Sequence, residues 1–416
     1  MSTVIAAIDI GTSTVRALIG SYSEEGSLSI IGAGSAPSTG LRAGRIVNIK
    51  ATMESVKEAV EAAEMAAGCE VHSCITAVGG SQIESFISKG LVAVGGRGSV
   101  REVNANDIER VLEASQAVSI PLDRHILHVV PRSYIVDGVD GIKDPLNRIG
   151  VRLEAEVCII TSSGTSTQNM LRCVSQAGYT VEDVMLKTLA SAQAVVTEEE
   201  KEVGSILIDL GGGTTDVLVL ADGSSLCTVS VPVGGSLVSN DIALVRGVSF
   251  ETAEKLKLSA GCCWEGLVGD DEEAVIPGIG GNPPQAISRL EICSIIRPRI
   301  EEIYAMIRDR LPEHVKQRHL NGSVVLVGGG SLLPGIVELT AKEFKTENVR
   351  IARPGNYGGQ VEIYRNPEFA TAAGLLVNGM AKFAKSDMGV SASSAKRKGA
   401  FLETAKKTLQ WFKEMF

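Results

Sequence analysis

The chain has 416 residues, which is more than one ordinary hydrophobic core holds, so two or more domains are expected. Its formal net charge of -9, with no basic stripe interleaved with aromatic residues, argues against a nucleic-acid partner. The eight cysteines lack the spacing of a zinc site or a disulfide framework, and no apolar run reaches the roughly 20 residues that span a bilayer. We therefore expect reduced thiols and a cytosolic protein.

The first part of the chain predicts a mixed α/β unit. Apolar runs bounded by turn residues indicate strands, and apolar residues at helical spacing indicate a helix. The predicted elements are strands at 4–10, 14–20 and 27–34, a helix at 51–67 and a strand at 75–78. This order, three strands followed by a helix and a strand, predicts one lobe.

The same order recurs in the second half of the chain. The predicted elements are strands at 205–210, 215–220 and 226–232, a helix from Ser236 and a strand at 324–327. A repeat of this length predicts two similar lobes that face one cleft. Each copy carries an insertion, residues 83–161 and 247–319, and each insertion is expected to form a subdomain.

Two segments combine an aspartate, an aliphatic residue, glycines and hydroxyl side chains directly after a predicted strand. They are Asp9-Ile10-Gly11-Thr12-Ser13-Thr14 and Asp209-Leu210-Gly211-Gly212-Gly213-Thr214-Thr215-Asp216. Glycine allows a tight turn whose N–H groups point at one anion, and the hydroxyls add donors. Asp9 and Asp209 cannot bind phosphate directly, so we expect them to hold Mg²⁺ through water. Two such hairpins predict a clamp for a polyphosphate.

A third glycine-rich segment follows the strand at 324–327. Gly328-Gly329-Gly330-Ser331 leaves bare backbone that can lie against an adenine or a ribose. A Walker P-loop and a GxGxxG fingerprint are both absent from the sequence. Together the three segments resemble the phosphate 1, phosphate 2 and adenosine motifs of the actin superfamily.

The superfamily resemblance implies an actin-like fold that binds ATP or ADP with Mg²⁺. It also assigns ribose and adenine contacts to Glu254 and Lys257, for which a solvated helix face is the alternative. Lys187 stands where hydrolytic relatives place the acid that orients the attacking water. We therefore expect at most slow ATPase activity.

The first insertion identifies the family. Its segments Ile120 to Pro131, Val136-Asp137-Gly138 and Gly150 to Ala155 closely resemble the 1C subdomain of the FtsA cell-division family. The resemblance implies that later division proteins bind this subdomain and that the chain assembles into filaments. It divides the chain into 1–82 with 162–202 (1A), 83–161 (1C), 203–246 with 320–384 (2A), and 247–319 (2B).

The second insertion is predicted to contain a long helix at 286–311 that carries five arginines. The family resemblance makes this 2B subdomain the docking site for the acidic C-terminal tail of the tubulin-like protein FtsZ. Arginine pairs carboxylates bidentately, and Arg297 and Arg299 are the candidates for this contact. A solvated, charged helix face is the alternative.

The end of the chain predicts a flexible linker at 385–399 and an amphipathic helix at 400–416. A basic, aromatic-rich amphipathic helix is typical of an in-plane anchor on anionic lipid. A helix docked on a partner or on the protein's own core is the alternative. The residues expected at the membrane are Phe401, Leu402, Leu409, Trp411, Phe412 and Phe416, with Lys406 and Lys413 at the border.

These features favour an ATP-binding, self-assembling adaptor that tethers FtsZ filaments to the cytoplasmic face of the bacterial inner membrane at the division site. Two other functions are considered. A pilus-assembly protein of the PilM kind shares the fold and a similar insertion but does not need the terminal helix. A sugar or small-acid kinase of the same superfamily needs a catalytic base, and the sequence offers no convincing one.

Overall fold

A computed structural model describes residues 3–23, 27–95, 100–277, 283–316, 322–359 and 362–386. Side chains are described as far as Met380. The predicted membrane helix and all of the predicted linker beyond Ser386 lie outside the described residues.

Each lobe is built on a five-stranded mixed sheet, and the two sheets share one topology. The first has the order β13-β6-β1-β2-β3, and the second has the matching order β20-β19-β14-β15-β16. In both, the first strand pairs antiparallel with the second and parallel with the strand that follows the helix. The strands of the first sheet are β1 (Thr3–Ile10), β2 (Thr14–Tyr22), β3 (Leu28–Pro37), β6 (Ser73–Val78) and β13 (Thr180–Leu186). Those of the second are β14 (Ser205–Leu210), β15 (Thr215–Ala221), β16 (Ser224–Val231), β19 (Val324–Val327) and β20 (Val349–Ile351). The predicted duplication is confirmed.

Close packing of a helix on the first sheet explains two of its glycines. Helix α1 (Ile49–Ala67) buries Val56 and Val60, and the side chain of Asn48 caps its first turn. A Cβ on Gly32 or Gly34 of β3 would lie 2.3 or 2.2 Å from a carbonyl oxygen of α1. Only glycine therefore lets the helix approach this strand.

The remaining helices connect the sheets and cover them. Helix α11 packs on α4 and on strands β1 and β6, so the last described helix belongs to the core of the first lobe. Their bounds are α3 (Gly164–Gln176), α4 (Lys187–Val195), α5 (Glu198–Val203), α6 (Gly235–Arg246), α10 (Ile336–Phe344) and α11 (Ala370–Ser386). Short strands β4 (Leu41–Arg42) and β5 (Arg45–Ile46) pair between β3 and α1.

The first insertion forms a sheet of its own. Its order is β10-β9-β12-β7, and β8 and β11, which lie between these strands in the sequence, form a separate pair. The helix α2 (Ala105–Ser115) packs on β7 and β12. The strands are β7 (Glu84–Ala93), β8 (Arg101–Glu102), β9 (Arg124–Val136), β10 (Val139–Ile142), β11 (Ile149–Gly150) and β12 (Arg152–Ser163).

The second insertion contains α7 (Phe250–Ala260), β17 (Glu273–Ile276), β18 (Gln285–Ser288), α8 (Arg289–Arg310) and α9 (Glu313–Lys316). The helix predicted at 286–311 is shorter than expected, because residues 286–288 pair with β17 as strand β18. The helix begins at Arg289, where the side chain of Ser288 accepts a hydrogen bond from the Leu290 N–H. The prediction was therefore wrong at its N-terminal end.

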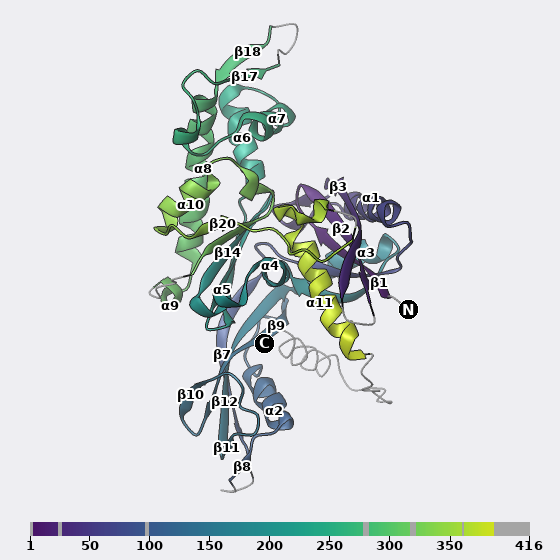
Figure 1. Ribbon diagram of the computed structural model, residues 1–416, viewed down its shortest axis with the longest axis vertical. Coiled ribbons are helices and arrows are strands. Elements are labelled where there is room, and N and C mark those ends of the chain that lie inside the picture. The colour runs from purple at the N-terminus through teal and green to yellow at the C-terminus, as the bar shows by residue number, and fades with distance from the viewer. Residues whose placement is uncertain are drawn as a thin grey trace.

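Figure 1 shows an elongated molecule with the two insertions at opposite ends. Strands β17 and β18 lie at the top with α6 and α7, and β8, β11 and α2 lie at the bottom. The first lobe, including α11, lies to one side of the middle. Over the part of the chain that the structure describes, no helix combines the length and apolar character needed to cross a membrane.

Candidate functional site

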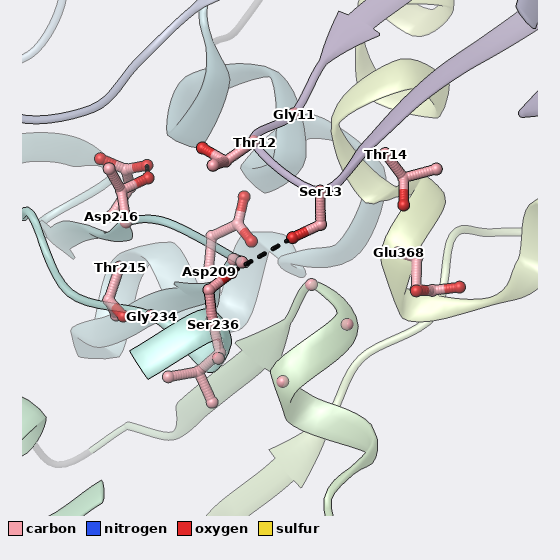
Figure 2. Close-up of a pocket in the computed structure, with 18 of the residues that line it drawn as sticks. Gly11, Thr12, Ser13, Thr14, Asp209, Thr215, Asp216, Gly234, Ser236 and Glu368 are labelled. Carbon is pink, nitrogen blue, oxygen red and sulfur yellow. Dashed lines mark hydrogen bonds between the residues drawn. The ribbon is translucent and has the colours of Figure 1, made fainter. Parts of the chain in front are cut away.

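A pocket of about 480 Å³ lies where the two lobes meet, and residues of both sheets line it. Its walls come from the β1–β2 and β14–β15 hairpins, the start of α6, the turn after β19 and the start of α11. Figure 2 shows the Gly11–Thr14 hairpin on one side and Asp209, Asp216 and Ser236 on the other. Because both lobes contribute, a bound ligand would contact both.

The two hairpins meet at their tips through glycines. Each is closed by a hydrogen bond, from Gly11 N to Thr14 O (3.1 Å) and from Gly211 N to Thr214 O (3.0 Å). A Cβ on Gly212 would lie 2.0 Å from Ser13 Oγ, and a Cβ on Gly213 would lie 2.6 Å from the Thr12 side chain. The glycines of the second hairpin are thus required by the approach of the first as well as by their own turn.

One end of the pocket is strongly acidic. Asp9 and Asp209 are the penultimate residues of β1 and β14, and Asp216 pairs with Asp209 across the β14–β15 hairpin. Asp216 accepts hydrogen bonds from Gly80 N (3.1 Å) and Thr214 Oγ1 (3.0 Å). The Nζ of Lys187 lies 2.6 Å from Asp9 Oδ1 and donates to Ile10 O at 2.8 Å.

Burial and close spacing shift the pKa values of the carboxyl groups at the acidic end. Desolvation in the pocket, together with the carboxylates of Asp216 and Asp9, raises the pKa of Asp209 to about 7. Burial also raises the pKa of Asp216, although its hydrogen-bond donors and Lys187 act in the opposite direction. Burial opposes the charge of Lys187, yet the nearby carboxylates of Asp9, Asp209 and Asp216 raise the pKa of its ammonium group.

Asp9 and Asp209 at the acidic end are the residues that could hold a hydrated Mg²⁺ ion. Among the described residues, no three His, Cys, Asp or Glu side chains are arranged to hold a metal ion between them. The Oδ1 atom of Asp9 is buried and lies 2.6 Å from the Lys187 ammonium. Mg²⁺ usually keeps several of its waters and is held by one or two carboxylates together with substrate phosphates.

Other parts of the pocket are lined by bare backbone and by apolar side chains. Gly234 and Gly235 precede and open α6, and Gly328, Gly329 and Gly330 form the turn after β19. Side chains of α7, α8 and the segment after β19 complete the apolar wall: Leu258, Ile300, Ile303, Leu332 and Leu333.

Glu254 and Lys257 line the pocket and form an ion pair. Lys257 Nζ donates to Glu254 Oε2 (2.8 Å) and to Gly235 O (3.0 Å). The hydroxyl of Ser239 also donates to Glu254. Glu254 and Lys257 come from α7 and line the pocket, and Ser239 of α6 supports Glu254.

The structure brings together all but two of the residues predicted to bind nucleotide. Gly213 and Ser331 do not line the pocket. Gly213 packs against Thr12, and Ser331 is buried and donates to Gly328 O at 2.7 Å, so both support the turns that do line it.

Other lining residues were not predicted as site residues from the sequence. Gly234 and Gly235 carried a visible signal, a glycine pair directly before a predicted helix, because helix N-termini bind anions. Glu368, which pairs with Arg16 at 2.6 Å, carried none, since more than half the chain separates the two residues.

The candidate FtsZ-tail arginines are engaged within the chain. Asp241 accepts a bidentate pair from Arg299 at 2.6 and 2.8 Å, and Glu302 accepts a further bond. Arg297 pairs with Glu301 at 2.9 Å and lies over the Trp264 ring. A docking role for either residue stays a prediction.

Known proteins resemble this chain over almost its whole length. The family model for cell division protein FtsA matches residues 206–374, and the model for the SHS2 domain inserted in FtsA matches residues 80–161. The FtsA proteins of Pseudomonas aeruginosa and Borreliella burgdorferi are 38% and 39% identical to it, covering 98% of this chain and 97% and 99% of theirs. The Escherichia coli K12 protein is 33% identical over 89% of each chain.

Solved structures with the same fold are more distant in sequence. A structure of the PilM–PilN type IV pilus biogenesis complex aligns with a TM-score of 0.65 at 18% identity, covering 90% of this chain and 98% of that chain. MreB5 of Spiroplasma citri bound to ADP aligns with a TM-score of 0.52 at 14% identity, covering 93% and 98%. These likenesses confirm the predicted actin-like fold, and the sequence relatives show that the chain belongs to the FtsA family of cell division proteins.

Proposed function

We propose that this chain is an ATP-binding, self-assembling adaptor that tethers FtsZ filaments to the cytoplasmic face of the inner membrane during cell division. The observation that carries the nucleotide part is the pocket between the lobes, where two glycine hairpins face each other beside three carboxylates. A role in cell division follows from the family. The tether is inferred from the terminal sequence.

Different residues of the pocket would hold the different parts of Mg-ATP. The N–H groups and hydroxyls of the two hairpins would hold the phosphates, and Asp9 and Asp209 would hold the hydrated Mg²⁺, which neutralises phosphate charge. The glycine turn after β19 would lie against the adenosine, with Glu254 and Lys257 at the ribose.

The same pocket supports slow turnover at most. A hydrolytic site needs a group that orients the attacking water, and the position expected to supply an acid holds Lys187. Its ammonium is occupied by Asp9 and Ile10 O, so it is not a free base. We propose that ATP acts mainly by closing the cleft and favouring assembly.

Assembly of the chain into a filament would strengthen its binding to the membrane. One amphipathic helix of residues 400–416 binds lipid reversibly, whereas a filament that presents many such helices binds far more tightly. The 2B region with Arg297 and Arg299 would receive the acidic FtsZ tail, and the 1C-like sheet would receive later division proteins. ATP would thereby control membrane attachment of the filament.

Sedimentation with anionic liposomes tests the tether. We expect the full-length chain to co-sediment, more so with ATP, and a chain that ends at Gly399 to stay in the supernatant. Phe412→Glu adds a carboxylate to the predicted apolar face and should abolish binding, because burying that charge in the acyl boundary is costly. Gln410→Glu adds the same charge to the predicted polar face and is the matched control.

Equal sedimentation of the full-length and shortened chains, or of neither, would contradict the anchor. That result would favour the pilus-assembly alternative, which needs no terminal helix. Binding of the tail that does not respond to ATP would retain the anchor but reject its control by assembly.

A further inference from the structure

Lys187 is the first residue of α4, and its side chain reaches the acidic end of the pocket. The side chain is only 14% exposed, and its Nζ atom is held by Asp9 Oδ1 at 2.6 Å and by Ile10 O at 2.8 Å. A Cβ on Gly79 would lie 2.8 Å from Lys187 Cδ, so the missing side chain there makes room for the lysine stem. The ammonium group therefore has a defined position.

Charge at this end of the pocket is unbalanced without Lys187. The other cations that the described lining contains are already matched: Arg16 pairs with Glu368 at 2.6 Å, and Lys257 pairs with Glu254 at 2.8 Å. Among the cations of the described lining, Lys187 is thus the one that is not paired with a glutamate, and its charge acts on Asp9, Asp209 and Asp216, with Arg16 also acting on Asp209. A polyphosphate that enters here brings several more negative charges.

We propose that Lys187 is a fixed counter-ion for the phosphate chain of the nucleotide, so that the chain binds ATP even when divalent cations are removed. This inference rests on the proposed nucleotide site and assigns a binding role to a residue that the family motifs do not include. Lys187 and a divalent cation would act on the same excess of negative charge. Removal of the Lys187 charge should therefore make ATP binding depend more strongly on the divalent cation, and removal of the cation should make ATP binding depend more strongly on Lys187.

The test is calorimetric titration of the full chain with ATP, with magnesium chloride or with EDTA. The quantity compared is the ratio of the dissociation constant in EDTA to that in magnesium. The test variant is Lys187→Gln, which removes the charge and keeps a polar group. Lys187→Arg keeps the charge, and Lys201→Gln is the matched control, because Lys201 is also buried and paired with a carboxylate, Glu198, at 2.6 Å, yet does not line the pocket.

We expect the unaltered chain to bind ATP measurably in EDTA. We expect Lys187→Gln to raise the ratio by on the order of ten-fold, the effect of losing one close charge pair. Lys187→Arg and Lys201→Gln should leave the ratio near that of the unaltered chain. Adenosine, which has no phosphate, should bind Lys187→Gln and the unaltered chain equally.

Other outcomes would overturn the inference. An unchanged ratio means that Lys187 only supports the structure, because a structural loss weakens binding equally in both buffers. A smaller ratio means that Lys187 competes with the metal for Asp9. If the unaltered chain binds ATP in magnesium but not in EDTA, the inference is contradicted, and this result does not depend on whether any variant folds. If it does not bind ATP in magnesium either, the proposed nucleotide function fails first.

Discussion

The carboxylates of Asp9, Asp209 and Asp216 make the pocket a site of unfavourable charge in the ligand-free chain. The positive charge of Lys187 compensates for only part of this negative charge. The pKa of Asp209 is therefore still raised to about 7 by burial and by the neighbouring carboxylates. Residues kept in such an environment usually serve a ligand, because replacing them by neutral residues would make folding easier. This trade-off can be measured.

Replacing Asp209 by Asn should stabilise the ligand-free chain, and more so at high pH. The folded chain holds the Asp209 proton with a pKa of about 7, against an ordinary value of 3.8 when unfolded. The wild-type free energy of unfolding therefore falls as pH rises through about 7. Between about pH 4 and about pH 7, the unfolding temperature of the variant should rise relative to wild type by on the order of a few degrees, and above about pH 8 the difference should stay constant.

Circular dichroism melts in EDTA measure this difference. Asp270→Asn, at an exposed position outside the pocket, makes the same chemical change and should show no such trend. A difference between Asp209→Asn and wild type that stays constant across pH would contradict the expected titration.

Two helices that border the pocket cross at a single glycine. Helix α4 carries Lys187, α11 carries Thr371 at the pocket wall, and Ser191 and Thr371 share a hydrogen bond of 2.9 Å. A Cβ on Gly374 of α11 would lie 1.7 Å from the Ala190 carbonyl oxygen of α4. The spacing of the two helices, and with it the position of Lys187, depends on that missing side chain.

Gly374→Ala should therefore destabilise the chain, by about 1 to 3 kcal/mol, because backbone atoms must separate to admit the methyl group. It should also weaken the proposed ATP binding, since α4 and α11 both contribute to the pocket. Gly164→Ala is the control, because its added Cβ would meet only ordinary contacts at 3.4 and 3.5 Å. Chemical denaturation compares the two, and equal stability would show that the crossing tolerates the change.

The first insertion links the two lobes, although the chain enters and leaves it through the first. Its strands β7, β9 and β12 pack against β16 of the second lobe. Ser85 Oγ donates to Thr228 O and accepts from Thr228 N, both at 2.9 Å. A change in the angle between the lobes would therefore alter the contacts of the insertion, which is the region proposed to bind later division proteins.

Ser85→Ala should loosen this contact by about 1 kcal/mol for the lost hydrogen bonds. Amide hydrogen exchange should then become faster along β16, because local opening costs less. Ser88→Ala is the matched control, since the Ser88 hydroxyl on the same strand bonds to Ser115 O inside the insertion at 2.7 Å. Equal exchange of β16 in both variants would mean that Ser85 does not join the insertion to the second lobe.

The sequence alone predicted the features that local chemistry decides. Alternating apolar runs and glycine turns marked most strands of the two sheets, and the repeated order predicted two lobes of one topology. The aspartate and glycine positions of Asp9 to Thr14 and Asp209 to Thr215 could be assigned to hairpins because strand ends and tight turns depend on residues next to each other in the chain.

Only the tertiary structure decided the contacts between distant segments. It placed Lys187 on Asp9, Arg16 on Glu368, and Ser13 against Gly212, and it turned residues 286–288 into a strand because β17 lies beside them. Periodicity predicts which face of an element is buried, but it does not specify which distant side chain meets that face. Those pairings arise when the lobes fold against each other, and they determine the charge balance of the pocket.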